Sequence, residues 1–443
     1  MDDRNSLLSS FKNKKVLVVG LGIQGGGAGI ASFFSKRGSF VKVTDLKIKK
    51  DLQESIDKLK DLSIEYTLGE HKLEDFLGAD YIFKGPSVPW DMPNLIEAQK
   101  KGIPIDMESS FVVSLLKSKV IGVTGTRGKS TTSQLIYETL KKINKNIFIG
   151  GNISGVSTID ILNHAKEDDI VVLELSSWSL SGFHRKKISP HIAVFTNFYP
   201  DHLNYYKSID DYLYDKKAIY LYQKRGDYCL INNDIKDKID LNEIKSYKIF
   251  YKKGNINIKF KYIKGEHNLE NAVAALEVSR LFDIDRKNAI EIIENFKGLP
   301  YRQQIIKIKN NITFINDSTS TTPTSLFKAI QTFSDKPIIL IFGGNNKNLP
   351  LDDILEKLKN ITKIIFTRGT LTDTIYPLLK KEYKNKVSII FSDLEQAVFG
   401  AYKEALSIHE PCYVLFSPGA TSFSMFKNEF DRGDAFNKIV NKI

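Results

Sequence analysis

Short apolar runs alternate with amphipathic stretches along the chain. The first run, Val16–Val19, is followed by a glycine-rich turn, a helix-like stretch at 28–38 and a second apolar run, Val41–Asp45. Continuous apolar runs are typical of buried parallel strands, and apolar residues three or four positions apart are typical of one helix face. This order predicts a Rossmann-type βαβ beginning.

The same alternation resumes twice. A strand beginning at Val120 precedes a loop and a helix in which Leu135, Ile136 and Leu140 share one face. The other predicted elements are strands at Tyr81–Phe83, Ile170–Leu175, Ile192–Thr196, Ile338–Phe342, Ile361–Thr367, Val387–Phe391 and Tyr413–Phe416, and helices at 107–119, Asn268–Phe282 and Asn288–Phe296. The lysine-rich stretch 234–264 is expected to be a surface excursion.

These patterns predict an α/β protein with three domains in series. At roughly 150 residues per domain, 443 residues also suggest about three. We place a Rossmann-like domain at 1–106, a central P-loop ATPase-type domain at 107–297, and a C-terminal Rossmann-like domain at 298–443. The turn Gly298-Leu299-Pro300 interrupts the helical pattern at the second boundary.

Composition narrows the class of protein. Hydrophobic residues make up 42% and only two cysteines are present, so a disulfide scaffold or a clustered-cysteine metal site is excluded. No apolar run is long enough to span a bilayer, and we expect a cytoplasmic monomer. The net charge is 64 − 52 = +12, but lysines are spread along the chain without a basic arm, which argues against nucleic-acid binding.

The most specific motif lies between the strand from Val120 and the following helix. It reads Gly125-Thr126-Arg127-Gly128-Lys129-Ser130, followed by Thr131. Backbone N–H groups and the helix N-terminus can surround phosphate oxygens, Lys129 can neutralise them, and the Ser130 hydroxyl can reach Mg²⁺. Although Val123 stands where a strict P-loop has its first glycine, the motif predicts ATP binding.

The first glycine turn is less specific. Gly20, Gly22 and Gly25 form a G-x-G-x-x-G pattern, and Asp45 follows twenty residues after the last glycine. This pattern suits NAD, but the same backbone cradle accepts any diphosphate, including that of a nucleotide-linked substrate. Tight turn packing without a ligand is a third interpretation.

Two further polar residues follow apolar strands of the central domain. Glu174 ends one strand and His202 lies in the loop after the next. Carboxyl ends of parallel strands face the ligand crevice, so both side chains can converge on a phosphate-bound metal.

Nine ordered motifs resemble the Mur ligase family from end to end. They are GTRGKSTT, ELSSW, TNFYPDHL, YLYDKKAIY, GEHNLENAVAAL, GLPYRQQ, NDSTSTTPTS, IFGGNNK and SPGATSFSMFKNEFDRG. The resemblance implies that the first domain binds the UDP of a sugar-peptide substrate rather than NAD, through Gly22, Ile23, Gln24 and Asp45.

The resemblance also implies the reaction. ATP would phosphorylate the L-alanyl carboxylate of UDP-N-acetylmuramoyl-L-alanine, and the amine of glutamate would attack the acyl phosphate to form an amide, in peptidoglycan precursor synthesis. D-Glutamate is the expected amino acid, and a divergent branch using L-glutamate stays open. Two anions meet in the first step, so Lys129 and two Mg²⁺ ions would screen them.

Site residues follow from the same resemblance. Lys129, Glu174, His202, Lys216 and Asn152 would be catalytic, and Ser130, Glu174, His202 and a carbamylated Lys216 would hold the metals. The family pattern around Tyr212 and Ile219 selects Lys216 rather than Lys217 as the carbamylated residue. Asn268, Asn271, Arg302 and Asp317 would contact the nucleotide, and Thr321, Lys347 and Ser422 would hold glutamate.

The chain departs from the family pattern at three places. Thr319 stands where a lysine is usual, Glu429 shifts an aromatic position by one residue, and 85–87 reads Gly-Pro-Ser instead of Ser-Pro-Gly. The alternatives are a Mur-type ligase for another amino acid or acceptor, an NAD-dependent oxidoreductase, and a nucleic-acid-stimulated P-loop ATPase.

Overall fold

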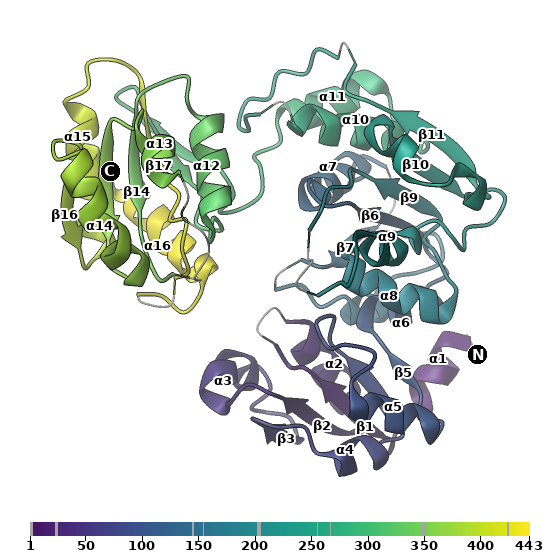
Figure 1. Cartoon of the computed structure of the whole chain (residues 1–443). Coiled ribbons are helices and arrows are strands. Elements are labelled where there is room, and N and C mark those ends of the chain that lie inside the picture. Colours follow the sequence, from purple (N-terminus) through teal and green to yellow (C-terminus); the bar gives the residue numbers. More distant parts are fainter. Residues whose placement is uncertain are drawn as a thin grey trace. The chain divides into compact units, whose positions relative to one another are not determined.

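The computed structural model describes residues 3–22, 25–143, 146–153, 155–201, 205–254, 256–265, 267–346, 351, 353–422 and 425–443 (Figure 1). The chain divides into two compact units, each described separately below. Unit 1 comprises Met1–Ile256 and Leu269–Ile290, and unit 2 comprises Asn257–Asn268 and Glu291–Ile443.

The first sheet of unit 1 is parallel, with the strand order β3-β2-β1-β4-β5. This doubly wound order brings the carboxyl ends of β1 and β4 together on either side of the predicted diphosphate turn. Its strands are β1 (Lys15–Val19), β2 (Phe40–Asp45), β3 (Ile64–Leu68), β4 (Tyr81–Lys84) and β5 (Ile105–Asp106). The accompanying helices are α1 (Asp3–Ser9), α2 (Gly26–Ser35), α3 (Lys49–Asp57), α4 (Leu73–Leu77) and α5 (Pro93–Lys100).

The second sheet of unit 1 is also parallel, in the order β11-β10-β9-β6-β8-β7. Its strands are β6 (Lys119–Thr124), β7 (Ile147–Gly151), β8 (Ile170–Glu174), β9 (Ile192–Phe195), β10 (Tyr228–Asn232) and β11 (Tyr247–Tyr251). The helices of this region are α6 (Glu108–Leu115), α7 (Lys129–Leu140), α8 (Ser177–Lys186), α9 (Ile209–Lys217), α10 (His267–Arg280) and α11 (Arg286–Glu294), with 3₁₀ turns η1 (Ile159–Asn163), η2 (Asn233–Lys238) and η3 (Leu241–Glu243).

The sheet of unit 2 has the order β12-β13-β17-β14-β15-β16, and β12 runs antiparallel to β13. Its strands are β12 (Gln304–Lys309), β13 (Ile312–Asn316), β14 (Ile338–Phe342), β15 (Lys363–Thr367), β16 (Val387–Phe391) and β17 (Cys412–Phe416). Side chains of α12 (Pro323–Thr332), α13 (Ile354–Leu358) and α14 (Thr370–Glu382) fill one core cluster, whereas those of α15 (Leu394–Leu406) and α16 (Glu429–Lys442) fill another.

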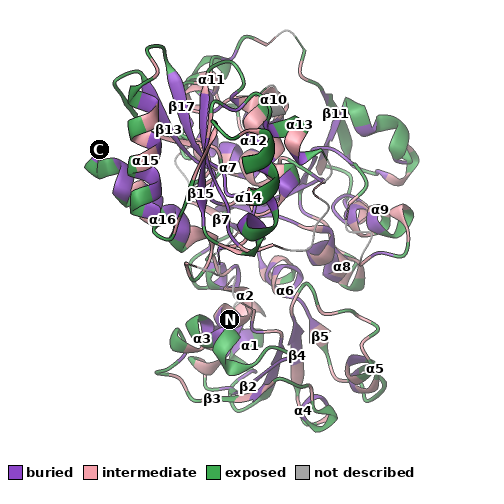
Figure 2. Cartoon of the chain, turned by 60° about the vertical axis from the view of Figure 1, so that its left-hand side comes forward, coloured by how far each residue is buried: buried purple, intermediate pink, exposed green. Residues whose placement is uncertain are grey.

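A single apolar cluster runs through both sheet regions of unit 1. It joins Val18 and Phe34 from the first region to Phe195 and Tyr212 from the second, and the central strands of each sheet are largely buried (Figure 2). The two regions approach each other closely at Gly29 of α2, where a Cβ atom would lie 2.1 Å from the Ser157 hydroxyl oxygen. Since no side chain fits there, α2 lies directly against the segment that precedes η1.

The α/β class with three sheet regions in series is confirmed, whereas the exact domain boundaries stay predictions. The predicted strands and helices agree with the observed elements to within a few residues. The interpretation of 234–264 as a mere excursion was incomplete, because β11 within it pairs with β10 although most of its residues are exposed or half-exposed. No helix among the described residues has the length and apolarity needed to cross a membrane.

Candidate active site

The glycine loop of unit 1 begins where β6 ends and closes where α7 begins. Gly125 and Gly128 have φ angles of 147° and 80°. A Cβ atom would lie 2.0 Å from the Thr196 hydroxyl oxygen at Gly125, and 2.4 Å from the Asn271 side-chain oxygen at Gly128. Both positions therefore require glycine for conformation and for space.

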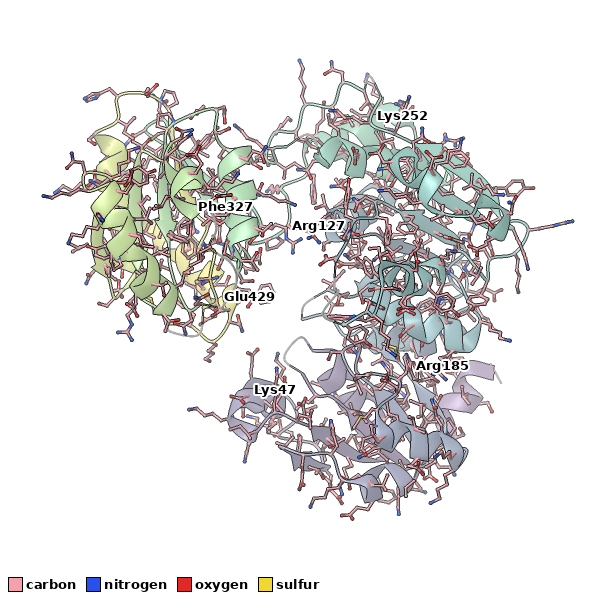
Figure 3. All side chains as sticks on the ribbon, in the orientation of Figure 1. Lys47, Arg127, Arg185, Lys252, Phe327 and Glu429 are labelled. Atoms are coloured by element: carbon pink, nitrogen blue, oxygen red, sulfur yellow. The ribbon has the colours of Figure 1, made fainter. Side chains whose placement is uncertain are left out.

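The loop is held by residues that follow β9. The Arg127 backbone N–H donates to the Asn197 side-chain oxygen at 2.8 Å, and the Thr196 hydroxyl donates to the Arg127 carbonyl at 2.7 Å. The Arg127 guanidinium donates to the Asp201 carboxylate at 2.6 Å; Arg127 is labelled in Figure 3. Thr196 and Asn197 were not predicted as loop supports, although both belong to the motif TNFYPDHL.

Lys129, Ser130 and Thr131 form the first turn of α7. The Lys129 ammonium lies back over the loop and donates to the carbonyl oxygens of Gly125 and Thr126, at 3.1 and 3.3 Å. Asn271 joins the loop from α10, because the Thr132 hydroxyl donates to its side-chain oxygen at 3.1 Å. Lys129 and Asn271, both predicted on the nucleotide side, therefore lie near the N-terminus of α7. The helix dipole favours an anion at this position.

Lys216 reaches the same loop from α9. Its side chain is 1% exposed, and its ammonium donates to the Gly125 carbonyl at 3.0 Å and lies 4.6 Å from the Tyr212 ring centroid. Burial, and secondarily the charge of Lys129, hold the pKa of Lys216 well below its ordinary value. Lys217 instead pairs with Glu243 at 2.8 Å. Only Lys216 of this pair therefore lies at the glycine loop.

Glu174 lies beside Asn152 at the carboxyl ends of β8 and β7. The Asn152 amide donates to a Glu174 carboxylate oxygen at 3.4 Å, and its backbone N–H donates to the Glu174 carbonyl at 2.7 Å. In the register of β6 and β8, Glu174 lies opposite Val123. Glu174 is therefore close to the start of the glycine loop. The described residues contain no cluster of three His, Cys, Asp or Glu side chains that could hold a metal by themselves. His202 lies outside the described residues.

The first glycine turn and Asp45 meet in the first sheet region. The Asp45 carboxylate accepts the backbone N–H groups of Gly22 and Lys47, at 3.1 and 2.9 Å. The pair predicted from sequence is therefore adjacent, and the carboxylate fixes the turn. Ile23 and Gln24 lie outside the described residues.

Asn268 and the remaining predicted residues belong to unit 2. The Asn268 amide donates to the Lys264 carbonyl at 2.7 Å, and Arg302 is exposed. Asp317 is 4% exposed and accepts from the Ser417 hydroxyl at 2.7 Å and the Gln303 N–H at 3.1 Å. Burial raises the pKa of Asp317 to about 7. Lys347 lies outside the described residues.

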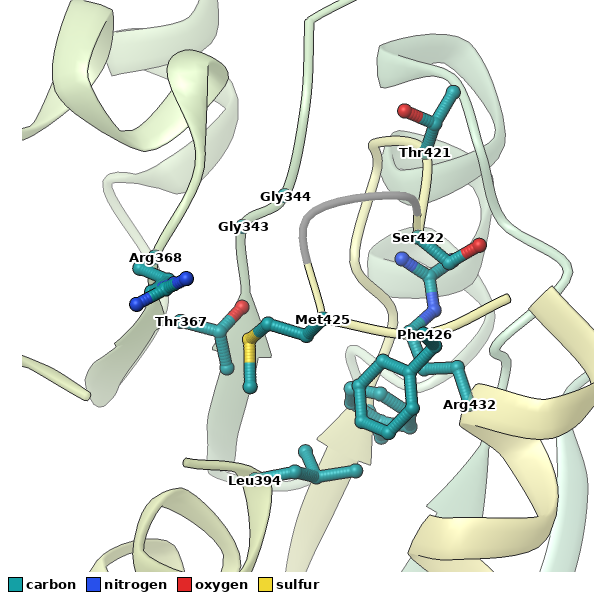
Figure 4. A pocket seen from close by; sticks show the side chains of 11 residues that line it. Gly343, Gly344, Thr367, Arg368, Leu394, Thr421, Ser422, Met425, Phe426 and Arg432 are labelled. Carbon is teal, nitrogen blue, oxygen red and sulfur yellow. The ribbon is translucent and has the colours of Figure 1, made fainter. Parts of the chain in front are cut away.

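The amino-acid side of unit 2 contains Thr319, Thr321 and Ser422. The Thr319 hydroxyl, which stands where the family pattern has a lysine, donates to the Tyr301 carbonyl at 2.9 Å. Thr321 is half-buried on the segment before α12. Ser422 is 3% exposed and borders a hollow at the end of the sheet (Figure 4).

Comparisons with known proteins identify the family of the chain. Residues 123–245 match the model of the Mur ligase middle domain, and residues 14–106 match the model of the Mur ligase MurD-like N-terminal domain. The UDP-N-acetylmuramoylalanine--D-glutamate ligase of Borreliella burgdorferi is 34% identical, over 99% of this chain and 100% of that protein.

Solved structures share the fold. The UDP-N-acetylmuramate-alanine ligase MurC of Thermotoga maritima aligns with a TM-score of 0.61 and 19% identity, over 97% of this chain and 99% of that one. MurF ligase of the same organism, in complex with ADP, aligns with a TM-score of 0.55 and 16% identity, over 98% and 97% of the two chains. The Borreliella burgdorferi ligase is 34% identical over 99% of this chain. The chain therefore belongs to the Mur ligase family.

Proposed function

We propose that the protein is an ATP-dependent ligase that joins D-glutamate to UDP-N-acetylmuramoyl-L-alanine in peptidoglycan precursor synthesis. The observation that carries this proposal is the match over 99% of the chain to a relative whose name specifies both substrates. The reaction needs an ATP site, an acceptor carboxylate and an amine, and the residues described above offer a group for each.

The glycine loop suits the ATP phosphates. Its two strained glycines leave no room for side chains, so backbone N–H groups can approach phosphate oxygens closely. Lys129 would leave its loop carbonyls for the phosphate oxygens, to which it is electrostatically better matched. The MurF ligase of Thermotoga maritima, solved in complex with ADP, supports a nucleotide as a ligand of this fold.

The donor set near the loop suits Mg²⁺. Glu174 offers a carboxylate and Ser130 a hydroxyl, and hard oxygen ligands with few protein groups are typical of Mg²⁺ sites that also use phosphates. Bound Mg²⁺ would neutralise charge on the phosphates and on the acceptor carboxylate. Glu174 and Ser130 would hold one ion, and His202 and Lys216 the other.

Lys216 is the candidate for carbamylation. An uncharged amine can attack CO₂, forming an N–C bond and losing one proton, which turns a cation into an anionic oxygen ligand. The enclosed position of Lys216 beside Lys129 and Gly125 supports this role, because an anion there would lie next to a cation and the glycine loop. Lys217 is paired with Glu243 and is the weaker candidate.

The remaining groups would hold the substrates. Gly22, Ile23, Gln24 and Asp45 would contact the UDP, Asn152 would lie near the acceptor carboxylate, and Thr321, Lys347 and Ser422 would hold glutamate. Asn268, Asn271, Arg302 and Asp317 would lie on the nucleotide side. Domain boundaries at 106/107 and 297/298, a monomeric state and a cytoplasmic location belong to the same proposal.

The test is phosphate release from ATP and Mg²⁺ in the presence of UDP-N-acetylmuramoyl-L-alanine. D-Glutamate, L-glutamate and no amino acid are compared in parallel, and the amide product is identified by mass. Release that depends on D-glutamate supports the proposal. Release with L-glutamate alone would move the chain to the divergent branch, and folded protein inactive with both would contradict the substrate assignment.

A further inference from the structure

The last turn of α9, which carries Lys216, does not end as a regular α-helix. The Ala218 N–H, which would close the α-helical bond to the Tyr214 carbonyl, donates instead to the Asp215 carbonyl at 3.3 Å. The Ile219 N–H follows the same tighter pattern and donates to the Lys216 carbonyl at 3.1 Å. The Tyr214 carbonyl is therefore open to a donor from outside the helix.

His184, in the last turn of the neighbouring helix α8, provides a donor (Figure 1). Its Nε2 atom lies 2.7 Å from the Tyr214 carbonyl oxygen, and its ring stacks on the Tyr214 ring with the centroids 4.2 Å apart. A carbonyl oxygen can only accept, so Nε2 carries the proton. The Nδ1 atom lies 2.8 Å from the Tyr222 hydroxyl, which can donate to it. Burial lowers the pKa of His184, which favours this neutral ring.

Ser189 holds the other side of the same turn. Its hydroxyl donates to the Ala218 carbonyl at 2.6 Å and accepts the Tyr222 backbone N–H at 3.0 Å. Tyr222 therefore supports both side chains, and we call His184, Ser189 and Tyr222 the α9 clamp. The two carbonyls that the α9 clamp holds lie two residues before and two residues after Lys216.

The helix α8 also connects this turn to the other metal-ligand candidate. Its first residue, Ser177, lies three positions after Glu174, which ends β8. A ten-residue helix is stiff because its own hydrogen bonds hold it, so His184 near its end keeps α9 in a fixed relation to β8. The α9 clamp thereby fixes the backbone from which the buried Lys216 side chain reaches to within 3.0 Å of the Gly125 carbonyl oxygen.

We propose that His184 is a positioning residue, which together with Ser189 holds the last turn of α9 so that the Lys216 amine stays at the glycine loop. This inference rests on the proposed function, in which Lys216 takes part in the reaction. Both residues act through the backbone of α9 rather than by touching a substrate. Both also lie outside the nine motifs that carry the family resemblance.

The experiment compares His184→Ala, His184→Gln and Ser189→Ala with the unchanged full-length protein. The amide of glutamine can place an N–H group near the position of Nε2, so His184→Gln should restore the bond to the Tyr214 carbonyl. His164→Ala is the matched control, because it makes the same substitution at an exposed histidine. Each protein is assayed for kcat, for the KM of ATP and of UDP-N-acetylmuramoyl-L-alanine, for the thermal midpoint, and for amide hydrogen exchange along α9.

The expected result is a kcat lowered about tenfold or more by His184→Ala, because a shift of about 1 Å at a catalytic group can lower a rate by about 100-fold. His184→Gln should lose less, and both KM values should stay within about twofold. Ser189→Ala should also lower kcat, and it tests the α9 clamp if His184→Ala fails to fold. His164→Ala should change none of these values.

An unchanged kcat in folded variants, or equal losses in His184→Ala and His184→Gln, overturns the inference. If the unchanged protein has no glutamate-dependent activity, the proposed function itself has failed, and hydrogen exchange then decides the inference. Faster exchange of His184→Ala in the last turn of α9, with α7 unaffected, supports the α9 clamp. Unchanged exchange in that turn overturns it.

Discussion

Lys216 and Lys129 donate hydrogen bonds to the same acceptor, the carbonyl oxygen of Gly125, at 3.0 and 3.1 Å. Two ammonium groups this close repel each other when both are charged, and one of them is buried. An uncharged or carbamylated Lys216 removes the repulsion. The carbonyl at the start of the glycine loop thus connects the ATP-side lysine with the lysine proposed to carry a metal ligand.

Lys216→Ala should lower kcat by about 100-fold or more, because a charge-stabilising ligand is lost. Short-chain carboxylates such as acetate or formate should restore part of the rate by supplying the missing oxygen. Lys217→Ala is the control and should retain most activity, since Lys217 pairs with Glu243 away from the loop. Phosphate release is measured for Lys216→Ala with and without the added carboxylate, and for Lys217→Ala. Full activity of Lys216→Ala would contradict the proposal that Lys216 carries a metal ligand.

Asn271→Ala should raise the KM of ATP by about tenfold, the equivalent of one hydrogen bond of ~1.4 kcal/mol. The reason is its position against Gly128 and its bond with Thr132. The KM of D-glutamate should not change. The KM of ATP and the KM of D-glutamate are measured in parallel for the variant and the unchanged protein. A larger rise in the KM of D-glutamate than in the KM of ATP would contradict the placement of Asn271 on the nucleotide side.

Gly29→Ala should lower the free energy of unfolding of unit 1 by about 1–3 kcal/mol, because its new methyl group would overlap the Ser157 hydroxyl. Ser157→Gly added to this variant should recover most of the loss, since the overlapping atoms are gone. Gly400→Ala, at another helical glycine, serves as the control because the methyl group meets only a Phe391 ring edge, at 3.2 Å. Urea unfolding is measured for the unchanged protein, for these variants and for Ser157→Gly alone. Additive losses in the double variant would contradict the prediction.

Asp317 should make stability depend on pH. Burial raises its pKa to about 7 against the opposing charge of Arg302, so between about pH 4 and 7 the folded protein holds a proton that the unfolded chain has released. Its contribution to the free energy of unfolding therefore falls as pH rises through that window, by up to ~1.4 kcal/mol per pH unit. The Asp317→Asn variant should lack this decrease in stability. Thermal midpoints of the variant and of the unchanged protein at several pH values test the prediction. Parallel pH curves for the two proteins would contradict it.

Local sequence patterns were sufficient for both glycine turns and for many of the buried strands, although the buried strands β10 and β13 were not predicted. Continuous apolar runs such as Ile338–Phe342 form buried strands, and Glu174 lies at a strand end as expected. Edge strands were missed because they mix lysine with apolar residues: β12 reads QIIKIK and is only partly buried. Its antiparallel pairing with β13 has no local signature.

Contacts between distant residues could not be predicted from the chain. Arg432 and Ser318 are separated by 114 positions, and nothing in the short motif around either indicates the other. The choice between Lys216 and Lys217 needed a family pattern, because adjacent lysines are equivalent by composition. Only the tertiary fold shows that one is enclosed and the other pairs with Glu243.

The absence of a side chain at Gly29 also determines which parts of this protein can be exchanged with those of a relative. A chimera that imports only the first sheet region would bring a foreign α2 against the native segment at Ser157, and any β-carbon at position 29 would collide with it. The transferable module therefore includes both the helix and the segment that precedes η1, although more than a hundred residues separate them in the gene.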